Sequence, residues 1–134
     1  MPKHLPISLL FLRFGVFIVF FFWTVDKFVN PEHAANVFAK FYALENLGIT
    51  IVYVIGSLQI ILIFSFVMGL FKKWTYGIIL LLHAASTFAS FSLYLTPFDN
   101  LLFFAAWPML AACLALYLMR DYDALTLGKN TSPV

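Results

Sequence analysis

The chain has 134 residues, of which 63% are hydrophobic and 19% aromatic, whereas only 10% are charged. Its formal net charge is +2, and its mean hydropathy is +0.97. A soluble fold of this length could not bury so much apolar surface, and the small net charge argues against a nucleic-acid partner. The composition therefore excludes an ordinary globular domain and predicts an integral membrane protein.

Four apolar stretches run along the chain, over residues 5–25, 47–70, 74–95 and 101–119. Each is close to the ~20 residues that a helix needs to cross a bilayer, and in lipid only a helix satisfies the backbone of such a segment. We therefore expect an all-α fold, an integral membrane four-helix bundle. A single transmembrane domain would cover residues 1–120, followed by a polar, mobile tail over residues 121–134.

The first stretch follows Lys3, as the apolar part of a secretory signal peptide would. Its apolar run is too long for a typical signal peptide, however, and the segment from Trp23 to Lys27 is not a small-residue cleavage site. We therefore expect a helix that the protein retains.

A short amphipathic helix is predicted over residues 31–44. Asn30, Pro31 and Glu32 have the pattern of an N-cap residue, a first-turn proline and a first-turn acid. Apolar residues then recur at helical spacing as far as Leu44, with polar residues on the other side. This helix would lie at the membrane interface, either as a simple connector or as a cover over the mouth of the bundle.

The later connections are short, so neighbouring helices should be antiparallel. Gly69 marks the end of the second stretch before a basic turn, and Pro97 ends the third. Asp99 or Asn100 can cap the fourth helix.

Charges outside the four stretches predict the orientation. One side has Lys3, Lys72, Lys73, Arg120 and Lys129, and the other has Lys27 and Lys40 with the acids Asp26, Glu32, Glu45 and Asp99. The positive-inside rule then places both termini in the cytoplasm. Aromatic residues near the ends of the stretches would anchor the helices at the interface, namely Trp23, Trp74, Tyr76, Tyr94 and Tyr117.

Arg13 is the only charged residue well inside any of the four stretches. A lipid-facing arginine costs ~2.5 to 3.5 kcal/mol on insertion scales, so Arg13 needs a partner, a water-filled pocket or a headgroup. Asp121 and Asp123 are expected to lie outside the membrane, which leaves no carboxylate at its depth. We therefore expect a neutral hydrogen-bond partner, a ligand oxygen or a headgroup phosphate, reached by snorkelling, in preference to a buried salt bridge.

The third stretch has a polar face that should point toward protein, made of His83, Ser86, Thr87, Ser90 and Tyr94. Serine and threonine in membrane helices commonly bond to their own backbone or pack between helices, which is the simpler interpretation of most of this face. For His83 two roles stay open, a structural hydrogen bond and a contact with a quinone or a proton.

At ~1.5 Å per residue, Arg13, Gln59 and His83 all lie in the cytoplasmic half of the membrane. A bundle that turns these residues inward would form a polar or ligand-binding pocket beneath the amphipathic segment. Its members would be Arg13, Gln59, His83 and Ser86, with Lys27 and Asp26 at the roof.

Missing residues exclude several chemistries. A single cysteine, Cys113, cannot form the disulfide relay of a four-helix thiol oxidoreductase. The three histidines lack the spacing of a zinc or copper site, and one membrane histidine cannot supply both ligands of a bis-histidine haem. No acid lies inside a stretch, unlike in a proton-coupled drug exporter. We expect no catalytic or metal site in this chain alone, and the one cofactor left open is a quinone.

The segment Leu12-Arg13-Phe14-Gly15, with Trp23 to Phe28 and Asn30-Pro31 after it, resembles the opening helix of the DoxX-like family of small membrane proteins. Gly56-Ser57-Leu58-Gln59 and Met68 to Phe71 are similar to that family's second helix, where a polar residue, often Glu, precedes an apolar run that ends in glycine. Here Gln59 stands at that position, which removes an acid–base role. The resemblance covers the layout of essentially the whole chain.

The resemblance implies a small bundle of a bacterial-type inner membrane, often an accessory subunit of a redox system such as a quinone-linked thiosulfate-oxidising enzyme. We therefore expect a non-catalytic membrane subunit of a redox complex, with membrane protein partners or self-association. Two other functions stay open. One is a stand-alone protein that binds quinone or another hydrophobic small molecule, with Arg13 and His83 as donors, and the other is a small transporter or lipid-handling protein.

Overall fold

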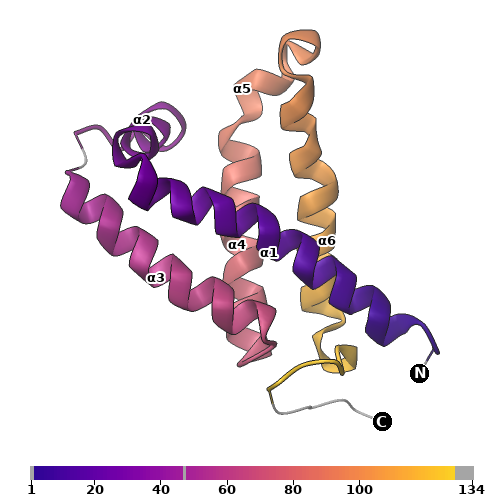
Figure 1. The fold of residues 1–134 in the computed structure, drawn as a ribbon. Coiled ribbons are helices and arrows are strands. Elements are labelled where there is room, and N and C mark those ends of the chain that lie inside the picture. Colours follow the sequence, from indigo (N-terminus) through magenta and orange to yellow (C-terminus); the bar gives the residue numbers. More distant parts are fainter. Residues whose placement is uncertain (1, 47, 129–134) are drawn as a thin grey trace.

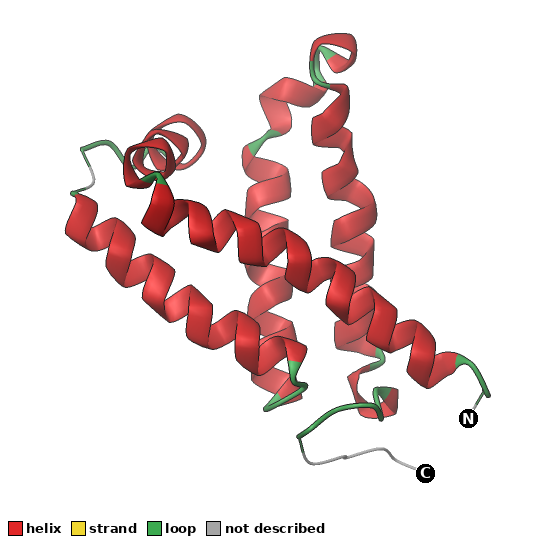
Figure 2. Cartoon of the chain, in the orientation of Figure 1, coloured by secondary structure: helices red, strands yellow, loops and turns green. Residues whose placement is uncertain are grey.

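The computed structural model describes residues 2–46 and 48–128, and the part of the chain that it describes is helical, with no β-strand (Figure 2). The all-α prediction is confirmed. The elements in chain order are α1 (Leu5–Val29), α2 (Pro31–Tyr42), α3 (Ile49–Val67), α4 (Lys72–Ala89), α5 (Phe91–Tyr94), the 3₁₀ helices η1 (Pro97–Asp99) and η2 (Leu101–Ala105), α6 (Ala106–Leu118) and the 3₁₀ helix η3 (Arg120–Tyr122). Lys129 and the rest of the predicted tail, residues 129–134, lie outside the described residues.

Three helical segments are long and apolar enough to cross a membrane: α1, α3 and Leu101–Leu118, which joins η2 to α6. α4 is less apolar, because it begins with Lys72 and Lys73 and carries the polar face around His83. The helix over the predicted third stretch is also interrupted at Ser90, between α4 and α5. Three of the four predicted stretches therefore form helical segments that are long and apolar enough to span a membrane.

The helices form two antiparallel pairs that cross each other (Figure 1). α1 packs along α3, and α4 packs along α6. In the view of Figure 1, α1 passes in front of α4 and α6, while α2 lies beside the far end of α1. The N-terminus, the turn between α3 and α4 and the end of α6 therefore lie at one end of the molecule, and α2 and α5 lie at the other.

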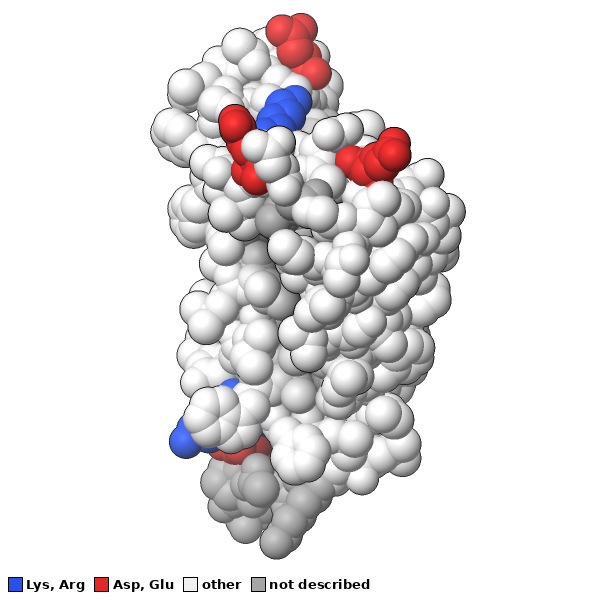
Figure 3. All heavy atoms as spheres, turned by 90° about the vertical axis from the view of Figure 1, so that its left-hand side faces the viewer, with Lys and Arg blue, Asp and Glu red and all other residues white. Residues whose placement is uncertain are grey.

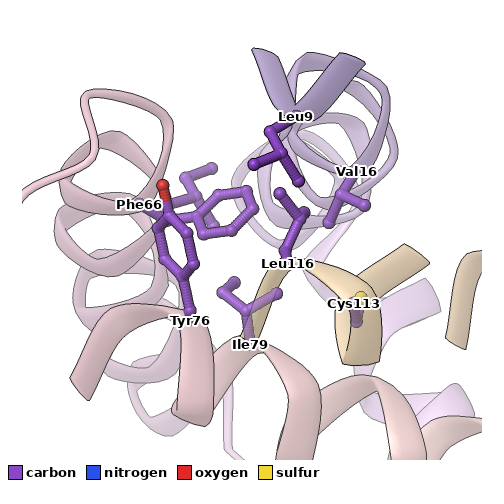
Figure 4. Close-up of a cluster of buried hydrophobic side chains, with 8 residues drawn as sticks. Leu9, Val16, Phe66, Tyr76, Ile79, Cys113 and Leu116 are labelled. Carbon is purple, nitrogen blue, oxygen red and sulfur yellow. The ribbon is translucent and has the colours of Figure 1, made fainter. Parts of the chain in front are cut away.

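One apolar core joins the two pairs. Eight buried residues form it, from α1, α3, α4 and α6: Leu9, Val16, Ile63, Phe66, Tyr76, Ile79, Cys113 and Leu116. Figure 4 shows these side chains converging between the helices. Burial of such side chains stabilises a fold by roughly 1.5 to 3 kcal/mol each in water, and in lipid close packing takes the larger part of that role.

Charged residues gather at the two ends of the molecule. On the face in Figure 3, the described Lys, Arg, Asp and Glu side chains lie near the top and the bottom, with an uncharged band between them. Large apolar residues are exposed on the helices, among them Ile61 of α3, which is 66% exposed. This is the pattern expected of helices whose outer faces contact hydrocarbon.

Asn30 and Asn100 occupy the N-cap positions of α2 and η2, as predicted, but neither makes a side-chain cap bond. The side chain of Asn30 makes no cap bond to α2, and its Nδ2 approaches Asp26 Oδ1 at 3.5 Å instead. Asn100 does not cap the following helix through its side chain either, because its Nδ2 donates back to the carbonyl oxygens of Leu93 and Thr96. Both amides stabilise the preceding turn rather than the next helix. Pro31 does occupy the first turn of α2, as predicted.

Candidate functional site

A cavity of about 690 Å³ lies between α1, α2, α4 and α6. α1 forms its longest side, from Phe11 to Lys27, and α2 closes one end with Phe38 and Phe41. The lining is largely apolar and aromatic, with a small number of polar side chains. Size and lining are both those of small-molecule sites, which are typically ~300 to 1,000 Å³ and mostly apolar with a few placed polar groups.

Five of the six predicted pocket residues line this cavity. Lys27 and Asp26 come from the end of α1, Gln59 from α3, and His83 and Ser86 from α4. α1 crosses the pair formed by α4 and α6 (Figure 1), and residues of α1 and of the polar face of α4 line the same cavity. Two interpretations of the amphipathic helix were open, a simple connector and a cover over the mouth of the bundle, and α2 supplies part of the cavity lining.

Lys27 is a buried cation in this lining, with 8% of its surface exposed. Its Nζ lies 3.3 Å from the carbonyl oxygen of Trp23 and 5.9 Å from the centre of the Phe38 ring. In the part of the chain that the structure describes, no carboxylate lies within salt-bridge distance of this ammonium. The ammonium is therefore in direct contact with a carbonyl and an aromatic face, while the Asp26 carboxylate acts on it only from beyond salt-bridge distance.

Asp26, next to Lys27 in sequence, points to a different partner. Its Oδ2 lies 2.6 Å from Nδ1 of His33 in α2, and the His33 ring stacks on Trp23 with ring centres 6.2 Å apart. These contacts hold the start of α2 against the end of α1. The Asp26 carboxylate is thereby bound to His33.

Gln59 contributes an unsatisfied acceptor. Its Oε1 is buried, and among the described residues it has no hydrogen-bond partner. Buried polar atoms in folded proteins are nearly always hydrogen-bonded, so an orphaned oxygen in a cavity lining marks a position that a donor could occupy.

His83 joins the two helices of the second pair. Its Nε2 lies 3.0 Å from the carbonyl oxygen of Ala106 at the start of α6, and its ring meets Phe20 of α1 edge-on at 6.2 Å. The contact with Ala106 is a structural hydrogen bond, which was one of the two roles expected for His83. The imidazole also lines the cavity, so the second role, a ligand contact, stays open.

The hydroxyls of the polar face bond to their own helix, as expected. Thr87 Oγ1 donates to the carbonyl of His83 at 2.8 Å, and Ser90 Oγ donates to the carbonyl of Ser86 at 3.1 Å. Tyr94 donates to the carbonyl of Thr87 at 3.0 Å. Ser86 is the exception, because it is exposed to the cavity.

Arg13 lies outside the cavity, in a buried ionic cluster at the opposite end of the molecule. Its Nη1 lies 2.7 Å from Oδ2 of Asp123, and only 2% of the Arg13 side chain and 0% of the Asp123 side chain are exposed. Its Nε donates to the carbonyl of Val67 at 2.9 Å, and its Nη2 to the carbonyl of Leu125 at 2.6 Å. The Tyr76 hydroxyl lies 3.4 Å from Nη1 and donates to Asp123 Oδ2 at 2.5 Å. All three guanidinium nitrogens thus bind protein groups.

Two predictions about Arg13 are therefore wrong. It has a carboxylate partner in a buried salt bridge, and it does not join Gln59 and His83 in the pocket. Asp123, expected outside the bundle, is completely buried because the chain turns back after α6. Tyr76, expected as an interfacial anchor, is 1% exposed and belongs to the core.

Residues 121–128 pack against the molecule rather than extending as a free tail. The Leu127 amide donates to the carbonyl of Met68 at 2.8 Å, and Lys72 Nζ donates to the carbonyl of Asp123 at 2.5 Å. Burial lowers the pKa of the Lys72 ammonium, and the adjacent Asp123 carboxylate opposes that shift. The expectation of a mobile tail is wrong for this segment.

The chemistry that the site can support is binding. Within residues 2–46 and 48–128, no group of three or more His, Cys, Asp or Glu side chains is placed to hold a metal ion. The cavity offers an apolar volume, the Lys27 ammonium, the unpaired Gln59 oxygen, the His83 imidazole and the Asp26 carboxylate that binds His33. Comparisons of this chain with protein-family models, with curated proteins and with solved structures give no match.

Proposed function

We propose that this chain is a multi-pass membrane protein that binds a hydrophobic small molecule in the cavity between α1, α2, α4 and α6. The observation that supports the proposal is the cavity of about 690 Å³, with an apolar and aromatic lining and a few polar side chains from α1, α3 and α4. A site of this composition favours a ligand with an apolar body and one polar group.

The membrane arrangement belongs to the same proposal. α4 with α5 forms a fourth span beside the three apolar helices, completing a four-helix bundle of a bacterial-type inner membrane. The end with Lys3, Lys72, Lys73 and Arg120 faces the cytoplasm, in keeping with the positive-inside rule. α2, with its apolar face toward the cavity, lies at the opposite interface.

The resemblance to the DoxX-like family supports a connection with a redox system, in which this chain serves as a non-catalytic subunit or accessory protein. A quinone is the hydrophobic molecule that such systems share, and it fits an apolar cavity with donors at its edge. In this version of the proposal His83 contacts the quinone, while Arg13 does not, because its guanidinium is already bound to Asp123.

Native mass spectrometry of the protein, purified in a mild detergent, tests the proposal. We expect a fraction of the molecules to carry the additional mass of a small lipophilic compound, identified after solvent extraction. Co-purifying subunits at defined stoichiometry would support the accessory role. A chain that carries neither a small molecule nor a partner would contradict both parts of the proposal.

A cavity-filling variant makes the test specific. Gly15 lines the cavity, and a Cβ built there meets nothing within 4 Å, so Gly15→Leu places a side chain in the open volume. We expect this variant to fold and to lose the bound compound. Ile18→Phe is the matched control, because Ile18 is on the same helix but is 54% exposed and lies outside the cavity lining. Equal retention by both variants would place the compound elsewhere.

A further inference from the structure

Lys27 is the most unusual member of the cavity lining. More than nine-tenths of its surface is buried, yet its ammonium has only a backbone carbonyl and the Phe38 ring as described partners. Removing a charge from water costs several kcal/mol unless an opposite charge or a full set of hydrogen bonds compensates. The nearest acid in sequence, Asp26, has its carboxylate at 2.6 Å from His33 instead. Asp26 lines the same cavity and acts on Lys27 electrostatically, but it forms no salt bridge with it, so among the described residues the Lys27 ammonium has no carboxylate in direct contact.

The geometry points to a single-chain amphiphile with a carboxylate headgroup, of the fatty-acid class, whose carboxylate binds Lys27 and whose chain lies along α1. This inference rests on the proposed function, since it names the ligand of the same cavity. A carboxylate supplies the missing direct contact, and one lysine ammonium matches a single carboxylate better than it matches a phosphate, which is usually held by several donors or an arginine fork.

The length of the cavity agrees with this ligand. α1 lines it from Phe11 to Lys27, which are ~24 Å apart along the helix axis at 1.5 Å per residue. The acyl chains of one leaflet span half of a hydrocarbon core of ~30 Å, so one chain fits within this length. Lys27 lies two residues before the end of α1, which places the carboxylate near the interface and the methyl end toward the middle of the membrane.

Competitive binding tests the inference. Wild-type protein in dodecyl maltoside micelles is loaded with cis-parinaric acid, whose fluorescence increases in an apolar site, and the signal is corrected with empty micelles. The probe is then displaced with palmitic acid, hexadecanol or hexadecylamine at neutral pH. We expect palmitic acid to act at about tenfold lower concentration than hexadecanol, because hydrogen bonds to charged groups are the stronger ones. Hexadecylamine should be the weakest.

Variants of Lys27 test whether its ammonium is the group that binds the carboxylate of the ligand. Lys27→Met should bring palmitic acid and hexadecanol to the same displacing concentration, whereas Lys27→Arg should keep the preference for the acid. Lys73→Met is the matched control, because Lys73 is an exposed lysine at the opposite end of the molecule. If Lys27→Met does not fold, as judged by circular dichroism, the order of the three ligands on the wild-type protein decides.

The outcomes separate the inference from the proposed function. Equal displacement by acid and alcohol, or a preference for the amine, overturns the acidic ligand and leaves the cavity as a site for neutral molecules such as quinones. A preference for the acid that persists in Lys27→Met overturns the role of Lys27. Probe binding that Gly15→Leu does not reduce overturns the proposed function itself.

Discussion

Arg13 and Asp123 form a buried ion pair, 2.7 Å from Nη1 to Oδ2, although 110 residues separate them in the sequence. The pair joins the first half of α1 to the segment that follows α6. Because the Arg13 guanidinium also binds the carbonyls of Val67 and Leu125, it connects α1, the end of α3 and the C-terminal segment. Arg13, although it lies in an apolar helix, thereby holds three parts of the fold together.

Loss of either partner should strongly destabilise the protein. Arg13→Leu leaves Asp123 buried without its counter-ion, and Asp123→Leu does the same to Arg13. Each single variant should lower the free energy of unfolding by roughly 3 to 5 kcal/mol, because an uncompensated buried charge remains. The measurement is equilibrium unfolding in mixed detergent micelles, followed by circular dichroism.

The double variant and a second arginine serve as controls. Arg13→Leu combined with Asp123→Leu should be less destabilised than the sum of the two single variants, because neither charge is then left alone. Arg120→Leu removes a partly exposed arginine that binds the carbonyl of Tyr117, and it should cost less than about 1.5 kcal/mol. Wild-type stability of Arg13→Leu would disprove that the Arg13–Asp123 pair stabilises the fold.

Tyr76→Phe should weaken the same cluster more gently. The change removes the hydroxyl that donates to Asp123 Oδ2 and keeps the ring in the core. A hydrogen bond to a charged group is worth roughly 1.5 to 3 kcal/mol, so we expect a loss of stability in that range. Tyr53→Phe, at a 41% exposed position that stacks on Phe28, should be nearly neutral. Equal melting temperatures for the two variants would count against a contribution from the Tyr76 hydroxyl.

Two glycine substitutions should have opposite effects. Gly69 has φ +72°, and a Cβ there would lie 2.3 Å from Thr126, so Gly69→Ala is both strained and in collision with the C-terminal segment. We expect it to lower the melting temperature. Gly15→Ala lies within α1 with open space at its Cβ, and it should raise stability by up to ~1 kcal/mol through helix propensity. Thermal unfolding of both variants checks the sign of each effect.

Cys113 should be unreactive until the protein unfolds. It is 1% exposed and packs in the core shared by α1, α3, α4 and α6. A thiol-reactive coumarin maleimide should therefore label the native protein very slowly and label it fully above the melting temperature. Lys73→Cys, at an exposed position in the first turn of α4, is the control that should react at once. Rapid labelling of Cys113 at low temperature would show that this core opens.

The sequence was sufficient for the helices, because hydropathy and helical periodicity depend on residues that are neighbours in the chain. α1, α2 and α3 begin and end within a few residues of the predicted stretches. The face of α4 that contains His83 was also predictable, since residues three and four apart lie on one side of a helix. So was most of the pocket, because Lys27, Gln59 and His83 are polar residues in or beside apolar helices.

The partner of Arg13 was not predictable. Asp123 follows the last span in a polar segment, and no local pattern indicates that this segment turns back into the fold. Only the tertiary structure brings it within 2.7 Å of Arg13. The different partners of Asp26 and Lys27 were likewise not predictable. Asp26 binds His33 of α2, whereas Lys27 contacts the carbonyl of Trp23.

The amino-acid sequence by itself determined that this protein is helical and apolar enough for a membrane, and that Arg13 needs a partner. Both follow from the free-energy cost of exposing polar groups to hydrocarbon, because that cost depends on the type of residue and can be assessed without knowing its tertiary contacts. Tertiary structure alone decided which polar residues meet. The crossing of the two helix pairs places Arg13 in a closed ionic cluster and leaves Lys27 in an open cavity, because the relative orientation of helices depends on packing between distant segments.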